Sequence, residues 1–190
     1  MALTIRSIVN TDIISIKGKG YLMKLSIQQE LPDTALSQMT ANGPKTTSVA
    51  ELTAGKKVIL VCMPGAFTQT CTNHHLPSLI RNSTTLFDKG IDKIICIVVN
   101  DIHVAKAWGE MTGAAKAGIT IVCDLESKFS DASGLSFSAP DVGFFQRLQR
   151  VLILLDNNVI KHIQLEENRG ECKLTSGDRI VGLVDTIYNL

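Results

Sequence analysis

The chain has 190 residues, of which 45% are hydrophobic and 19% charged, and its formal net charge is +1. This composition predicts one globular domain with a full core and excludes extended disorder. The charge gives no reason to expect a nucleic-acid partner or a membrane surface, and no run of about 18 apolar residues predicts a transmembrane helix.

The first 22 residues carry three basic residues against one acid, which is a little like a transit peptide. A secretory signal is not supported, because no compact apolar stretch ends in a small-residue cleavage site. Met23 would serve as a natural start of translation, so residues 1–22 are consistent with an upstream extension of the reading frame. They are equally consistent with an edge strand or a hairpin that turns at 17–20. We expect an N-terminal extension over 1–22 and a single domain over 23–190.

Apolar runs and turn residues predict the elements in chain order. An early extended segment ends at a turn over 41–45. Nearly continuous apolar runs predict buried strands, whereas Ser, Asn and Gly at element ends mark caps and turns. The expected elements are a strand at 57–63, a helix at 70–89 that Pro77 kinks or restarts, a strand at 93–100, a helix at 102–111, a strand at 120–123, a short helix at 128–135, a hairpin of 150–155 and 159–164, and a final helix capped by Ser176 that runs to about Tyr188.

Strands that alternate with helices imply right-handed parallel crossovers, and the closing hairpin adds antiparallel strands. The sequence therefore predicts an α/β fold, a three-layer sandwich with a mixed central sheet. In the helix at 102–111 we expect Val104, Ala107, Trp108 and Met111 to form one apolar stripe.

Five cysteines, at 62, 71, 96, 123 and 172, form no CxxC pair. An odd, widely spaced set argues against a secreted disulfide framework and for a reducing compartment. No metal site is expected, because spaced ligand pairs are missing and His74 and His75 are adjacent. We expect Cys62 and Cys123, which lie inside strands, to be structural.

Cys71 differs from the other cysteines because polar residues surround it and it follows a buried strand at the start of a helix. Unpaired N–H groups and the helix dipole stabilise negative charge at that position, which favours the nucleophilic thiolate. The carboxyl end of a central strand is also where open α/β sheets place their chemistry. Cys71 is therefore the candidate nucleophile.

The segment PGAFTQTC, residues 64–71, followed by His-Leu-Pro at 75–77, resembles the active-site segment of the type II peroxiredoxins. The resemblance continues through Ile-Val-Val-Asn-Asp at 97–101, Ala-Trp at 107–108 and Arg150, and it covers about residues 24–190. Gln69 and Ser78 depart from the family pattern, in which many relatives have proline and glycine.

The resemblance implies a thioredoxin-like fold and a peroxidase that needs no bound cofactor. Cys71 would attack the peroxide and become sulfenic acid, Thr68 would hydrogen-bond the thiolate or a peroxide oxygen, and Pro64 would wall the pocket. Arg150, with Arg147 as an alternative, would place a guanidinium beside the sulfur. His75 would orient the pocket or add positive charge.

Three routes would recycle the sulfenic acid. Cys96 matches a proposed resolving cysteine of plant relatives, although its strand is expected to be buried. Cys172 lies in a loop near the resolving position of mammalian relatives, with its register about two residues off. We favour the third route, in which an external thiol attacks Cys71 directly, with Cys96 second and Cys172 third.

The expected partners are a hydroperoxide and either glutathione with glutaredoxin or thioredoxin, without nucleic acid or membrane. Relatives of this type commonly form homodimers through the active-site face. A cytoplasmic location is expected, or an organellar, mitochondrial one if residues 1–22 act as a targeting extension. A disulfide exchanger is disfavoured because Thr68 occupies the first position of a CxxC motif. A redox-relay or binding protein without turnover is the other alternative.

Overall fold

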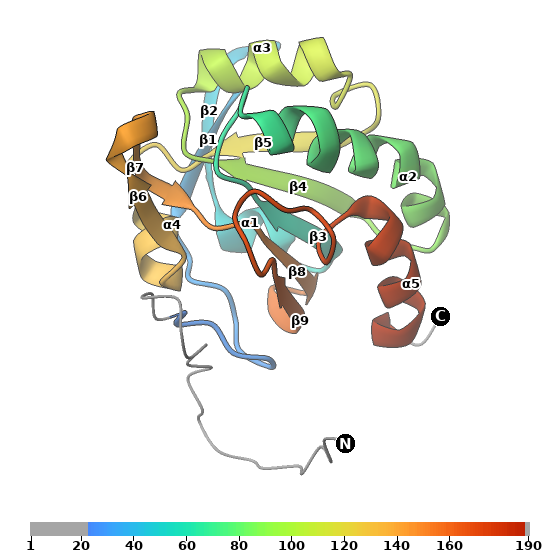
Figure 1. Cartoon of the computed structure of the whole chain (residues 1–190). Coiled ribbons are helices and arrows are strands. Elements are labelled where there is room, and N and C mark those ends of the chain that lie inside the picture. The colour runs from blue at the N-terminus through green and yellow to red at the C-terminus, as the bar shows by residue number, and fades with distance from the viewer. Residues whose placement is uncertain (1–22, 189–190) are drawn as a thin grey trace.

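The computed structural model describes residues 23–188, which are arranged around one central sheet (Figure 1). The strands of this sheet are β1 (Ala35–Thr40), β2 (Gly43–Ser48), β3 (Lys57–Cys62), β4 (Lys93–Val98), β5 (Ile119–Cys123), β8 (Val151–Asp156) and β9 (Val159–Leu165). Their order across the sheet is β2-β1-β5-β4-β3-β8-β9. A separate antiparallel pair consists of β6 (Ser136–Ala139) and β7 (Phe144–Leu148).

The helical segments are α1 (Val49–Thr53), the π-helix η1 (Cys71–His75), α2 (Leu76–Asp88), α3 (Ile102–Thr112), α4 (Lys128–Ser133), the 3₁₀ turn η2 (Pro140–Val142) and α5 (Gly177–Tyr188). Strands β3, β4 and β5 are parallel neighbours, as the continuous apolar runs predict. Helices α2 and α3 connect them, and β8 pairs antiparallel with β3. The mixed sheet is therefore confirmed.

The helix predicted over 70–89 forms as η1 followed by α2. Pro77 lies in the first turn of α2, where its missing N–H is not needed, so the helix restarts there. The predicted hairpin also forms, with left-handed φ values of 49° at Asn157 and 66° at Asn158 between β8 and β9. Two-residue hairpin turns of the primed type require such values, and asparagine tolerates them.

Alternate residues of the central strands enter two separate cores, one on each face of the sheet. Helices α2, α3 and α5 cover one face, and α1 and α4 cover the other (Figure 1). The first core includes Ile59, Val61, Leu79, Trp108 and Ile180. The second core includes Val49, Val58, Leu60 and Phe129. This arrangement is the predicted three-layer α/β/α sandwich.

The predicted apolar stripe of α3 is confirmed for Trp108 and Val104, which pack in the core, and is wrong for Ala107 and Met111. Trp108 is fully buried, but Met111 is 58% exposed and Ala107 is also exposed. The helix instead turns its small residues to the sheet, because a Cβ on Gly109 would lie only 3.0 Å from Ile121. The small residues allow the helix to lie close to the strand, and this close approach fixes the buried face.

Three parts of the fold were not predicted as regular elements. The early extended segment forms the hairpin of β1 and β2, turning within the predicted 41–45 region, and Ser48 caps the short α1. Strands β6 and β7 are joined by η2, which contains Pro140.

Residues 1–22 lie outside the described residues, so the expected extension and the 23–190 domain boundary stay predictions. Within 23–188, no helix is both long and apolar enough to span a bilayer.

Candidate active site

Cys71 is the first residue of η1, just after the loop that follows β3. Its side chain is fully buried. The N–H of Leu76 donates to the Cys71 carbonyl, one residue further along than in an α-helix. The sulfur therefore lies on a wide helical turn at the carboxyl edge of the sheet, a kind of turn that is frequent at functional sites.

Arg150 reaches this edge because β8 is the antiparallel neighbour of β3 and Val151 pairs with Cys62. Its Nη2 donates to Cys71 Sγ at 3.4 Å and to the Arg169 carbonyl at 3.2 Å. The residue is 3% exposed, and its buried Nε–H has no hydrogen-bond partner within the described residues. The Cys71 thiol thus contacts a guanidinium whose Nε–H is still available as a hydrogen-bond donor.

His75 lies one turn after Cys71 and links Arg150 to the last loop of the chain. Its Nε2 is 2.8 Å from the carbonyl oxygen of Thr175, and its Nδ1 is 2.9 Å from Nη1 of Arg150. A carbonyl only accepts and a guanidinium only donates, so the proton is on Nε2 and Nδ1 accepts. Burial, assisted by the Arg150 charge, lowers the pKa of His75 from 6.5 to about 3. The neutral ring favours the orienting role over the added positive charge.

Glu166, which sequence reasoning missed, shapes the loop that holds His75. Its Oε1 accepts from the backbone N–H groups of Lys173, Leu174 and Thr175 at 2.8–2.9 Å and from the Thr175 hydroxyl at 2.8 Å. A buried carboxylate that gathers three amides fixes the backbone around it. The Thr175 carbonyl is thereby aimed at His75. Two adjacent acids after a strand, Glu166 and Glu167, gave no signal of this role in the sequence.

A pocket of about 570 Å³ opens beside Cys71, between the loop over 64–70 and the β6–β7 pair. Pro64 and Thr68 line it, as does Arg150, which contacts the sulfur, whereas Cys71 itself is fully buried and is not among the lining residues. The Thr68 hydroxyl donates to the Gly65 carbonyl at 2.9 Å, so its oxygen keeps its acceptor capacity. Thr68 makes no hydrogen bond to Cys71 within residues 23–188.

Arg147 lies close to the same loop without touching the sulfur. Its Nη1 donates to Asn100 Oδ1 at 3.2 Å and to the Pro64 carbonyl at 3.4 Å. Asn100 Oδ1 also accepts from the Ala66 N–H at 2.9 Å. Arg147 and Asn100 therefore brace the loop, and Arg150 is the arginine at the thiol. Asn100 was part of the resemblance, but no role was predicted for it.

The other cysteines differ in burial and in the face of the sheet that they occupy. Cys96 is fully buried in the same core as Cys71, and burial raises the pKa of its thiol well above the usual value. Cys172 is half-buried, and burial raises its pKa to about 11. Cys62 and Cys123 are buried inside strands, as predicted for structural cysteines. Within 23–188, no three potential ligands gather as a metal site.

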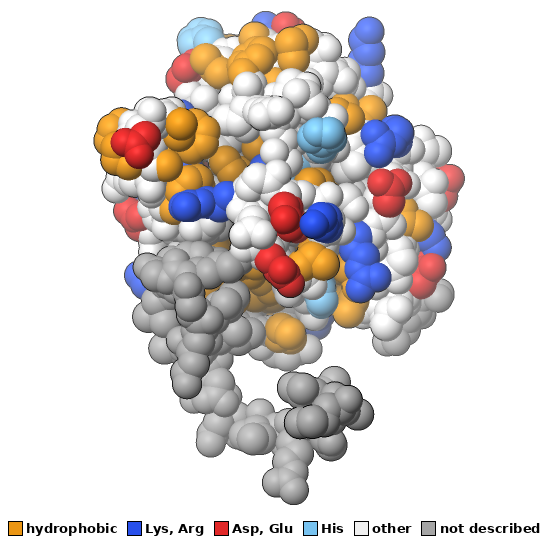
Figure 2. Space-filling model, viewed as in Figure 1, with side chains coloured by type: hydrophobic (Ala, Val, Ile, Leu, Met, Phe, Trp, Pro, Cys, Tyr) orange, Lys and Arg blue, Asp and Glu red, His pale blue; other side chains and the backbone are white. Residues whose placement is uncertain are grey.

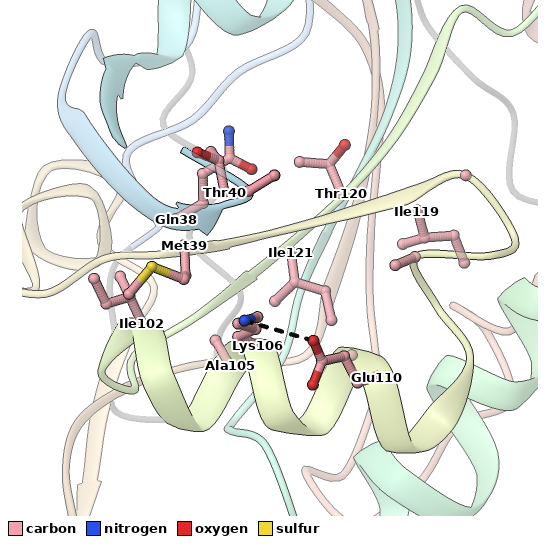
Figure 3. A pocket seen from close by; sticks show the side chains of 14 residues that line it. Gln38, Met39, Thr40, Ile102, Ala105, Lys106, Glu110, Ile119, Thr120 and Ile121 are labelled. Atoms are coloured by element: carbon pink, nitrogen blue, oxygen red, sulfur yellow. Dashed lines mark ion pairs between the residues drawn. The ribbon is translucent and has the colours of Figure 1, made fainter. Parts of the chain in front are cut away.

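A second groove, of about 590 Å³, lies between β1, α3 and β5 (Figure 3). Lys106 and Glu110 of α3 form an ion pair along it at 3.7 Å, Ile121 of β5 faces this pair, and Met39 of β1 lies beside Ile102. No cysteine, histidine or arginine lines this groove. This groove therefore lacks the residue types that thiol chemistry requires.

The fold and the buried cysteine–arginine pair define a thioredoxin-like, cysteine-dependent oxidoreductase. The Redoxin family matches residues 27–180. The chain is 40% identical over 147 residues to Peroxiredoxin-2E-2, chloroplastic, of Oryza sativa subsp. japonica, covering 75% of this chain and 65% of that protein. It is 37% identical over 158 residues to Peroxiredoxin-2D of Arabidopsis thaliana, covering 83% and 96%. The chain belongs to the type II peroxiredoxins, which are thiol peroxidases without a prosthetic group.

A solved structure agrees with this assignment. Reduced Prx3 from Vibrio vulnificus in complex with hydrogen peroxide is 36% identical, with a TM-score of 0.78, and the match covers 84% of this chain and 99% of that one. The expected thioredoxin-like fold and thiol peroxidase activity are therefore confirmed.

Proposed function

We propose that Cys71 is the peroxidatic cysteine and that it reduces hydrogen peroxide and alkyl hydroperoxides with the help of Arg150. The observation that carries this proposal is the contact of Arg150 Nη2 with Cys71 Sγ, combined with the unpartnered Nε–H of the same guanidinium. A peroxide in contact with the sulfur would accept a hydrogen bond from that Nε–H. The complex of Vibrio vulnificus Prx3 with hydrogen peroxide supports this substrate class.

In the proposed step, the Cys71 thiolate attacks the terminal oxygen of R–O–O–H. An S–O bond forms, the O–O bond breaks, and the sulfur loses two electrons to become sulfenic acid. The leaving RO⁻ takes a proton and departs as ROH. Arg150 stabilises the charge that develops on the leaving oxygen, Thr68 accepts a hydrogen bond from the peroxide, and Pro64 limits the access of water.

For recycling we retain the external thiol as the first route, with Cys96 second and Cys172 third. Attack on a sulfenic acid requires a thiolate, and burial disfavours the thiolate of both internal candidates. An external thiol attacks Cys71, releases water and forms a mixed disulfide, which a second thiol then reduces. Glutathione with glutaredoxin, or thioredoxin, would supply these electrons.

We further propose a homodimer through the active-site face. Three large hydrophobic side chains are exposed around the pocket, at 52%, 65% and 63%: Phe67, Val142 and Phe145. Such a cluster marks a protein contact in soluble proteins. For the compartment we propose a cytoplasmic location, with an organellar one as the alternative, since the names of relatives include chloroplastic and mitochondrial forms.

The test is peroxide consumption in the presence of dithiothreitol by the native protein and by Cys71→Ser. The native protein should turn over, and the variant should show no turnover above background. Normal activity in Cys71→Ser would refute the assignment. A native protein that reacts once without turning over would instead support the redox-relay alternative.

Single Cys96→Ser and Cys172→Ser variants, assayed with glutaredoxin and glutathione and separately with thioredoxin, test the recycling route. Unchanged turnover in both variants is expected. Loss of turnover in one of them would identify that cysteine as the resolving thiol.

A further inference from the structure

The pocket beside Cys71 is much larger than hydrogen peroxide needs. Its volume of about 570 Å³ falls in the range of cavities that hold small organic ligands. Its walls include the aromatic rings of Phe67, Phe137 and Phe144, together with Val142. Figure 2 shows hydrophobic side chains gathered over β6 and β7, with an acidic side chain among them and basic side chains at their border. The pocket therefore offers room and apolar surface for the organic part of a hydroperoxide.

Arg169 gives this apolar pocket a positive charge at a second position, apart from Arg150. Its guanidinium carbon lies 4.5 Å from the ring centroid of Phe137, and both residues line the pocket. Stacking on an aromatic face holds the planar fork of an arginine in place.

The guanidinium of Arg169 is not paired with an acid within the described residues. No ion pair or side-chain hydrogen bond of its guanidinium exists within residues 23–188. Glu171, the acid two residues further along, pairs with Lys173 at 3.4 Å and accepts from Asn168.

From this arrangement we infer that the pocket prefers organic hydroperoxides that carry a carboxylate, and that Arg169 binds that carboxylate. The inference rests on the proposed function, because Cys71 must be the reacting thiol. The apolar body of such a substrate packs on the phenylalanine rings, and its carboxylate pairs with the stacked guanidinium. The reaction is the one given above, in which Cys71 becomes sulfenic acid and the substrate leaves as the corresponding alcohol.

The test compares two substrates of equal size, cumene hydroperoxide with a para-carboxylate and the same compound with a para-carboxamide. We compare their kcat/KM values with dithiothreitol as the reductant at low salt. In the native protein the value for the carboxylate should be about five times that for the carboxamide, which is the effect expected of a well-placed exposed ion pair. The ratio should fall to about one in Arg169→Gln and be partly retained in Arg169→Lys. It should also fall with added salt.

Lys116→Gln is the matched control, since it removes the same charge at an exposed side chain that does not line the pocket and forms no ion pair within the described residues. This variant should keep the native ratio. Equal rates for the two substrates in the native protein would overturn the inference while leaving the peroxidase assignment intact. Equal loss of the preference in Lys116→Gln would overturn the role of Arg169. Failure of the native protein to react with hydrogen peroxide would overturn the proposed function and this inference together.

Discussion

The neutral state of His75 makes a quantitative prediction about the pH dependence of stability. The imidazole is buried between Thr175 and Arg150, with a pKa of about 3 in the folded protein against 6.5 when exposed. Between these two values the unfolded chain binds a proton that the folded chain does not, so stability falls as the pH falls from 6.5 toward 3. At pH 5 this single group should cost about 2 kcal/mol relative to neutral pH.

The perturbation is His75→Gln, whose amide can accept from Arg150 and donate to Thr175 but does not titrate. Urea unfolding followed by circular dichroism, at pH 7 and pH 5, gives the free energy of unfolding of each protein. The native protein should lose about 2 kcal/mol more than His75→Gln between the two pH values.

His74→Gln is the control, because His74 is exposed and should leave the native pH dependence unchanged. An equal loss in the native protein and in His75→Gln would refute the assignment of a neutral, buried imidazole.

Two further predictions concern the loop and helix that support the site. Glu166→Ala leaves three amides without their acceptor, so the free energy of unfolding, measured with urea, should fall by about 3 kcal/mol. The rate of peroxide reduction should also fall, because the Thr175 carbonyl is no longer held in place. An unchanged rate would contradict the positioning role of Glu166. Gly177→Ala should lower the melting temperature by at least about 5 °C, because a Cβ there would lie 2.1 Å from the Ser78 carbonyl oxygen. Gly182→Ala in the same helix, with no atom within 4 Å of its Cβ, should raise it; similar effects of both substitutions would contradict the proposed close contact.

The sequence predicted the central layers well because their apolar runs are long and continuous. The parallel strands and the hairpin at Asn157 and Asn158 follow from such runs and from turn chemistry. The face of α3 was predicted only in part, because Ala105 and Gly109 give little hydrophobic signal, although their small size is what allows close packing. The β6–β7 pair was not predicted from the sequence, because its short strands are joined by a turn that contains proline.

The candidate site was predicted only in part. The position of Cys71 follows from the strand-to-helix pattern, whereas the pairing with Arg150, 79 residues away, came from the family resemblance. No local pattern could show that Glu166 would fold the last loop onto His75, because that contact depends on tertiary structure alone.

The most direct measurement is the location of the sulfenic acid after oxidation by less than one equivalent of hydrogen peroxide. Dimedone trapping followed by tandem mass spectrometry should place the adduct on Cys71 in the native protein. In Arg150→Gln the adduct should form on the same residue about a hundredfold more slowly, as expected for loss of a donor that stabilises developing charge. An adduct formed first on Cys96 or Cys172, or an unchanged rate in Arg150→Gln, would contradict the role of the buried cysteine–arginine pair.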